Sequence, residues 1–228
     1  MQYRIEGGSL PVVLVRLTAG EQLISQAGGR TWSRGPVQTE TKAEGGAGGA
    51  LGRLFTGESL FMSRYTARGD AEIAFASTFP GSIVARQLAA GESIVCQKRA
   101  FLAATLGVKL SVFFQKRLGV GLVGGEGFLM QRVTGPGTAF FEIDGYAAEY
   151  TLAPGEQIVC DTGALALMDA TCSVDVRLVN SVKGMIFGGE GIFDTVITGP
   201  GKVTLQTMSA AQLAQILLPY LPTQTSSH

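Results

Sequence analysis

Apolar and polar residues alternate along much of the chain, which is the pattern of strands that bury one face. In residues 174–178, for example, Val174, Val176 and Leu178 alternate with Asp175 and Arg177, a period of two. Turn-forming residues, above all glycine, separate such runs. The pattern predicts an all-β chain.

Two phrases recur in the same order three times. The first, Leu-x-x-Gly-Glu-x-(Leu/Ile)-(Ile/Val), occupies residues 17–24, 88–95 and 152–159. The second begins with Gly-Glu and has Thr eight and Gly eleven residues after the Glu; its glutamates are Glu58, Glu126 and Glu190. From glutamate to glutamate, the two phrases are 37, 34 and 34 residues apart. This spacing predicts three tandem units, at about residues 10–81, 82–145 and 146–207.

Each unit is too short and turn-rich for a comfortable independent domain, so we expect residues 1–207 to form one β domain with a shared core. Pro80-Gly81 and Asp144-Gly145 each lie seven residues before the Leu of the next first phrase. We therefore predict an equivalent hairpin turn at each of these two positions.

The C-terminal region has a helical pattern. Ser209 is a suitable N-cap, and a helix at residues 208–221 would carry its apolar residues at helical spacing: Leu213, Ile216, Leu217 and Tyr220. Pro219 should end or kink this helix, and residues 222–228 are expected to be a disordered tail. Residues 110–118 fit a short helix or a strand.

Composition narrows the chemistry. Glycine is about 14% of the chain, twice the usual ~7%. The 18 basic residues offset the 18 acidic residues, which disfavours a protein built to hold phosphate backbones. His228 is the only histidine, which excludes histidine-based triads and zinc sites. The three cysteines lack metal or disulfide spacing and are expected to be small buried residues. We expect no cofactor, no metal site and no catalytic residues.

Acidic side chains are nonetheless candidates for a site. Glu58, Glu126 and Glu190 either serve their turns or line a shared pseudo-threefold binding site between units. In the alternative of a carboxylate-based enzyme acting on a small molecule or sugar, these glutamates, or Asp161 with Asp194, would serve as acid and base.

Two other features have two interpretations each. Trp32 is either an exposed contact residue or part of a packed edge. A basic group in the middle unit is either a solvated face or a nucleic-acid site; its members are Lys98, Arg99, Lys109, Lys116 and Arg117. The other units do not repeat it, so a nucleic-acid-binding ring is disfavoured.

At Gly124–Phe128 and Thr134–Gly137, repeated at residues 188–191 and 198–201, the sequence resembles the altered-inheritance-of-mitochondria family of largely uncharacterised bacterial and mitochondrial proteins. The resemblance covers residues 1–207. It implies three tandem pseudo-repeats, each a short double-stranded β-helix or β-sandwich like the subunit of the tryptophan RNA-binding attenuation protein, and a homotrimer. It implies no established reaction. The first unit departs from the pattern, with Glu58-Ser59 and Thr66-Ala-Arg-Gly69.

These observations predict a non-enzymatic oligomeric scaffold or binding protein whose ligand is an unidentified protein or small molecule. The units leave strand edges at the two ends of the chain. A closed trimer would cover them, whereas the C-terminal helix could seal a sheet or dock on a neighbour. No run reaches the roughly 18 apolar residues of a membrane span, and the first residues lack a signal pattern, so a cytoplasmic location is expected.

Overall fold

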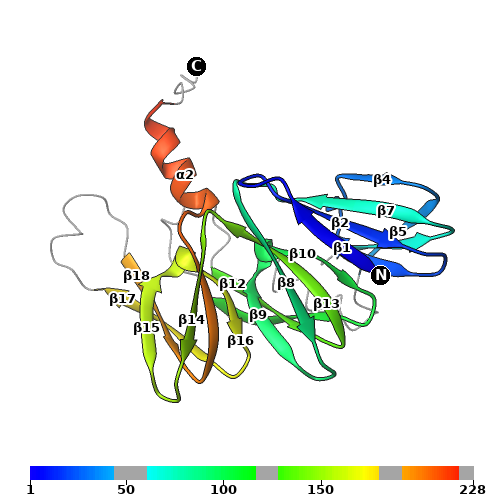
Figure 1. The fold of residues 1–228 in the computed structure, drawn as a ribbon. Coiled ribbons are helices and arrows are strands. Elements are labelled where there is room, and N and C mark those ends of the chain that lie inside the picture. The colour runs from blue at the N-terminus through cyan, green and yellow to red at the C-terminus, as the bar shows by residue number, and fades with distance from the viewer. Residues whose placement is uncertain (44–60, 117–127, 180–191, 221–228) are drawn as a thin grey trace.

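A computed structural model of the chain describes residues 1–43, 61–116, 128–179 and 192–220. The described residues form antiparallel β-sheets and one C-terminal α-helix, which confirms the all-β prediction (Figure 1). In sheet order, sheet A holds β1 (Gln2–Glu6), β2 (Val12–Leu17), β7 (Ala71–Ala76) and β4 (Trp32–Arg34). Sheet B holds β5 (Val37–Ala43), β6 (Phe61–Ala67), β3 (Gln22–Gln26), β10 (Phe101–Thr105), β13 (Gly137–Asp144) and β8 (Gly81–Leu88).

The other two sheets lie toward the C-terminus. Sheet C holds β11 (Lys109–Lys116), β12 (Phe128–Thr134), β9 (Ser93–Gln97), β16 (Leu165–Asp169), β19 (Gly201–Gln206) and β14 (Ala147–Leu152). Sheet D holds β15 (Gln157–Asp161), β18 (Ile192–Thr198) and β17 (Ser173–Val179). Figure 1 shows sheets A and D at opposite ends of the molecule.

The order in which strands pair recurs along the chain. We call β2–β7, β8–β13 and β14–β19 the first, second and third segments. In each segment the first, sixth and third strands lie side by side, as in β2-β7-β4, and so do the fourth, fifth and second, as in β5-β6-β3. Sheets B and C each join half of one segment to half of the next, through the pairs β3–β10 and β9–β16. We call these two strand pairs the internal junctions.

The predicted hairpin turns at Pro80-Gly81 and Asp144-Gly145 are wrong. At these positions the chain passes from one sheet to another, because β7 and β8 lie in sheets A and B, and β13 and β14 lie in sheets B and C. Gly145 has a positive φ, of 73°, whereas Gly81 does not; the N–H of Gly145 donates to the carbonyl of Pro80 at 2.8 Å. Turn-forming residues therefore do not determine which strand pairs with which.

Three apolar cores separate the four sheets described. The first contains Tyr65 and Phe75, between sheets A and B. The second contains Cys96 and Phe141, between sheets B and C. The third contains Ile197, between sheets C and D. As predicted, Cys96 and Cys172 are buried, whereas Cys160 is half-buried.

The C-terminal helix, α2 (Ala210–Leu217), begins where the sequence predicts. Ser209 Oγ accepts the N–H of Gln212, and the Gln212 side chain accepts the N–H of Ser209, which makes a capping box. A 3-10 turn, η3 (Leu218–Tyr220), follows at Pro219. Two further 3-10 turns, η1 (Lys98–Ala100) and η2 (Thr162–Ala164), precede β10 and β16. The ambiguous residues 110–118 lie largely in strand β11.

Candidate interaction site

The predicted binding residues Glu58, Glu126 and Glu190 lie outside the described residues. The glutamates of the first phrase can be placed. Glu21, Glu92 and Glu156 each accept, through Oε2, the backbone N–H of the residue three positions earlier, at 2.8, 2.8 and 2.7 Å. The preceding glycine has φ of 89°, 82° and 80°, respectively. These three carboxylates therefore help to close the turns between strands.

The structure does bring the other predicted carboxylates together. Asp161 on β15 and Asp194 on β18 are directly opposite cross-strand partners. Asp161 is exposed, and its Oδ1 accepts the N–H of Gly163 at 2.7 Å, where η2 begins. Its carboxylate thus stabilises a local turn, and neither residue lines the two surface hollows described next.

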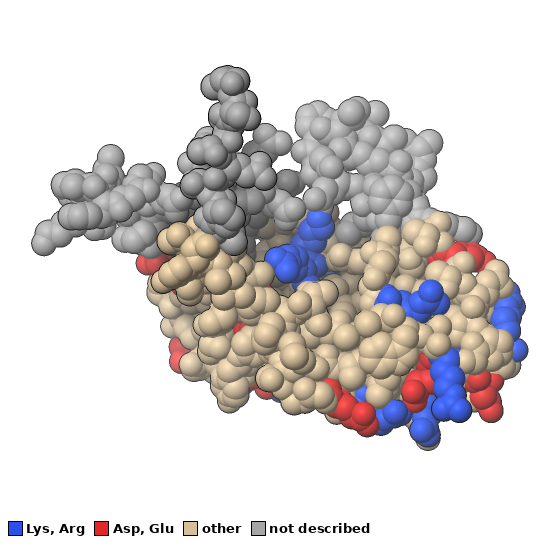
Figure 2. Space-filling model, turned by 90° about the horizontal axis from the view of Figure 1, so that it is seen from above, with Lys and Arg blue, Asp and Glu red and all other residues tan. Residues whose placement is uncertain are grey.

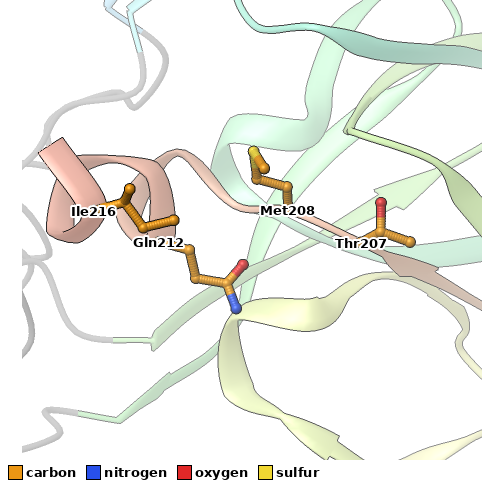
Figure 3. Close-up of a pocket in the computed structure, with 4 residues that line it drawn as sticks. All are labelled: Thr207, Met208, Gln212 and Ile216. Atoms are coloured by element: carbon orange, nitrogen blue, oxygen red, sulfur yellow. The ribbon is translucent and has the colours of Figure 1, made fainter.

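The first of these hollows, of about 450 Å³, lies at the base of α2. Its lining residues are Thr207, Met208, Gln212 and Ile216, which Figure 3 shows along the segment from the end of β19 into the helix. None of these four side chains ionises. These four side chains therefore offer no group for proton transfer.

The second hollow, of about 380 Å³, lies beside the junction of the first two segments. Four apolar residues and two cations line it: Ile24, Arg64, Leu106, Val108, Lys109 and Leu110. This composition suits an apolar group that carries an adjacent negative charge. Sequence reasoning missed this hollow, because Arg64 and Lys109 come from different segments.

Both internal junctions use the same register. In the first, Ser25 lies opposite Ala103 and Ile24 opposite Ala104. In the second, the corresponding pairs are Cys96 with Leu167 and Val95 with Met168. The relative exposures of these eight residues range from 0% to 7%.

A glutamine side chain crosses each internal junction as well. Gln26 Nε2 donates to the carbonyl of Lys98 at 3.1 Å, and Gln97 Nε2 donates to that of Gly163 at 3.2 Å.

Two strands that correspond to those of the internal junctions, β4 and β15, lie at sheet edges and have no partner on one side among the described residues. β4 is the third strand of its segment, like β10 and β16, and is the last strand of sheet A. β15 is the second strand of its segment, like β3 and β9, and is the last strand of sheet D. Trp32 on β4 is 47% exposed and Val159 on β15 is 56% exposed. Of the two interpretations of Trp32 drawn from the sequence, the structure therefore agrees with an exposed residue.

More apolar side chains are exposed near the C-terminus. They belong to α2 and its two flanks: Met208, Ile216, Leu217, Leu218 and Tyr220. Figure 1 shows α2 projecting away from the sheets, so it does not seal a sheet within the subunit. Charged side chains in the view of Figure 2 gather mainly toward the end of the molecule that carries sheet A.

In the part of the chain that the structure describes, no group of three or more His, Cys, Asp or Glu side chains is arranged to hold a metal ion. No helix in those residues has the length and apolar character to cross a membrane. Burial raises the pKa of the Cys160 thiol to about 11, with Asp161 and Asp194 adding to the effect. A thiol of this kind is a poor nucleophile at neutral pH.

The fold and these surfaces define a class of protein: stacked antiparallel sheets with apolar residues exposed on end strands and on a projecting helix. Residues 3–208 match the family described as mitochondrial biogenesis AIM24, and the chain belongs to this family. The resemblance drawn from the repeated phrases is therefore confirmed.

The chain is similar to proteins of Streptococcus pyogenes. An uncharacterised protein of the serotype M6 strain is 30% identical over 224 residues, which covers 95% of this chain and 89% of the relative. The crystal structure of a protein from this species has a TM-score of 0.76 at 26% identity, and covers 96% of this chain and 99% of that one.

Proposed function

We propose that this protein is a non-enzymatic scaffold or binding protein that works as a homo-oligomer, with three copies as the expected number. The observation that carries the proposal is the 56% exposure of Val159, a residue whose counterparts Ile24 and Val95 are 7% and 0% exposed. A surface built like the interior of the same molecule is what a self-associating protein presents.

The test is the mass of the purified protein in dilute solution. Light scattering after size exclusion should give three times 23.8 kDa, and the mass should persist over a tenfold dilution. A single 23.8 kDa species at all concentrations would overturn the oligomer. Reproducible turnover in an unbiased metabolite screen, lost when a pocket residue is changed, would overturn the non-enzymatic part.

The binding part of the proposal is supported by the hollow beside the first internal junction, whose lining combines four apolar residues with the cations Arg64 and Lys109. An apolar ligand with one acidic group, such as a fatty acid, should raise the melting temperature of the protein. The double variant Arg64→Gln/Lys109→Gln should lose that shift. The same ligand screen on the triple variant Glu58→Gln/Glu126→Gln/Glu190→Gln tests the predicted binding site at those glutamates.

A cytoplasmic location is also part of the proposal, as the sequence analysis expects. Fractionation of cells that express the protein at natural levels tests it, and recovery in the membrane or secreted fraction would contradict it.

A further inference from the structure

We infer that β15 of one copy pairs with β4 of a second copy as an antiparallel strand pair, so that sheet D of one molecule and sheet A of the next form one continuous sheet. This inference rests on the oligomer proposed above and names its interface. It follows from strand pairs that the chain already makes twice within itself.

The three segments share a rule for which of their strands lie at sheet edges. The first and fourth strands of a segment lie at sheet edges. β8 and β5 end sheet B, β14 and β11 end sheet C, and β17 ends sheet D; the first strand β2 is covered only by β1. By contrast, strands in the positions of β4 and β15 are paired in both internal junctions, as β3 with β10 and as β9 with β16. In the described chain, every other second or third strand of a segment is paired on both sides. β4 and β15 are the exceptions, because each is paired on one side only.

The register follows from the same comparison. Ser25, Cys96 and Cys160 each lie four residues after the glutamate of the first phrase. Within the chain, Ser25 pairs with Ala103 and Cys96 with Leu167. On their other side, Ala103 and Leu167 lie opposite the fourth residue of β13 and of β19, Phe140 and Thr204. Trp32 likewise lies opposite the fourth residue of β7, Ala74, and is therefore their equivalent. The pairs between copies are therefore Cys160 with Trp32, Val159 with Ser33, and Ile158 with Arg34.

Side-chain burial agrees with this register. Ile24, in the first segment, is part of the second core, and Val95, in the second segment, is part of the third core. Each thus enters the core of the following segment. Val159, in the third segment, occupies the same position, has no further segment packed over it among the described residues, and is exposed. In the paired copies it enters the first core of the next molecule, beside the short side chain of Ser33.

The resulting sheet has the size that this fold uses. Three strands of sheet D and four of sheet A make seven, against six in sheets B and C, and β1 is the additional strand. The two edges lie at opposite ends of the molecule (Figure 1), so the contact is head to tail and repeats until a ring closes. One contact differs: Asp161 takes the place of Gln26 and Gln97 and cannot donate across the junction as they do.

A disulfide tests the register. Directly opposite residues of an antiparallel pair have Cα atoms about 4.5–5.5 Å apart, within the range that disulfides span. The variant Trp32→Cys should therefore form a disulfide with Cys160 of another copy under mild oxidation, seen as covalent oligomers on a non-reducing gel. Trp32 is half-exposed, so its replacement leaves the fold intact.

Two matched controls accompany this variant. Ser33→Cys places its thiol on the opposite face of the strand and should give no such product. Trp32→Cys combined with Cys160→Ser should also give none. Equal cross-linking by Ser33→Cys, or no cross-linking by Trp32→Cys in a protein that remains oligomeric, would overturn the inference.

A charge at the edge tests the interface itself. Val159→Lys should reduce the mass to 23.8 kDa, because the interface would have to bury an unpaired ammonium group. Val112→Lys is the matched control: Val112 is 50% exposed on β11, an outer strand of sheet C, and its replacement should leave the oligomer unchanged. Circular dichroism checks that both variants are folded.

The outcomes separate the inference from the proposed function. If the wild type is a monomer, both fail. If the wild type is an oligomer that Val159→Lys leaves intact while Trp32→Cys gives no cross-link, the oligomer stands and this interface is wrong.

Discussion

At the scale of single residues, the buried polar groups hold irregular segments against the sheets. Glu142 on β13 is 9% exposed. Its Oε2 accepts the N–H of Thr78 at 2.7 Å and the hydroxyl of Ser77 at 3.0 Å. These bonds fasten the segment in which the chain passes from sheet A to sheet B.

Replacing Glu142 by Ala should lower the free energy of unfolding by about 1–3 kcal/mol, because the N–H of Thr78 would lose its acceptor in a half-buried place. Urea unfolding measures the change. Glu149→Ala is the control, since Glu149 is 51% exposed and pairs with Arg86 at the surface. Its effect should stay within about 1 kcal/mol, and an equal loss in both variants would contradict the role given to Glu142.

The Cys160 thiol should react slowly with iodoacetamide at pH 8. Its pKa is raised from 9.0 to about 11, so the thiolate fraction, and with it the rate, is about a hundredfold lower than for an ordinary thiol. Because a raised pKa favours the protonated form, the rate should climb about tenfold per pH unit up to pH 11. Peptide mass spectrometry at Cys160 measures it.

Asp161→Asn and Asp194→Asn each remove a neighbouring negative charge, so each should lower this pKa and speed the alkylation. A rate at pH 8 equal to that of the urea-unfolded chain would contradict the burial of the thiol.

At the scale of elements, local signals and long-range pairing have separate roles. The turn before β15 has Pro154 and Gly155 in its two central positions, and the N–H of Glu156 donates to the carbonyl of Ala153 at 3.0 Å. This is the chemistry of a type II turn, in which the second central residue needs a positive φ. The same phrase therefore makes the same turn in all three segments.

The capping box of α2 gives the prediction at this scale. Ser209→Ala should destabilise the helix by about 1 kcal/mol, because the N–H of Gln212 loses its side-chain acceptor. Hydrogen exchange of the α2 amides should become faster, while exchange in the sheets stays unchanged. Ser209→Asp keeps an acceptor and should retain the slow exchange; equally fast exchange in both variants would show that the cap does not support the helix.

At the scale of the whole molecule, shared sheets couple the three segments. Sheets B and C each contain strands of two segments, so no segment can unfold without leaving strand edges and a core open on its neighbour. Trp32, the only tryptophan, reports from the first segment, so the following test uses the Val159→Lys background, in which no neighbouring copy is expected to lie against Trp32.

A cavity in the third core tests this coupling. Ile197 is fully buried there, and Ile197→Ala should cost about 2–5 kcal/mol. If the segments unfold as one unit, Trp32 fluorescence and far-ultraviolet circular dichroism should shift to the same lower urea midpoint. Unchanged Trp32 fluorescence together with a two-step dichroism curve would mean that the third segment unfolds by itself.

The sequence by itself determined the features that depend on neighbouring residues. The alternation at residues 174–178 predicted strand β17, and Ser209 as an N-cap before apolar residues at helical spacing predicted the start of α2. Residue spacing along one strand or one helical turn carries this information directly. The repeated phrases indicated the family. They also predict three units, and the order in which strands pair recurs three times in the structure. The origin of the units by triplication stays an interpretation.

Only the tertiary structure decided which strands meet. Pro80-Gly81 has the composition of a hairpin turn and yet carries the chain into another sheet. Ile24, Val95 and Val159 end three copies of one phrase, and the first two are buried while the third is exposed. A residue's burial depends on the segment that packs over it, and among the described residues no segment packs over Val159.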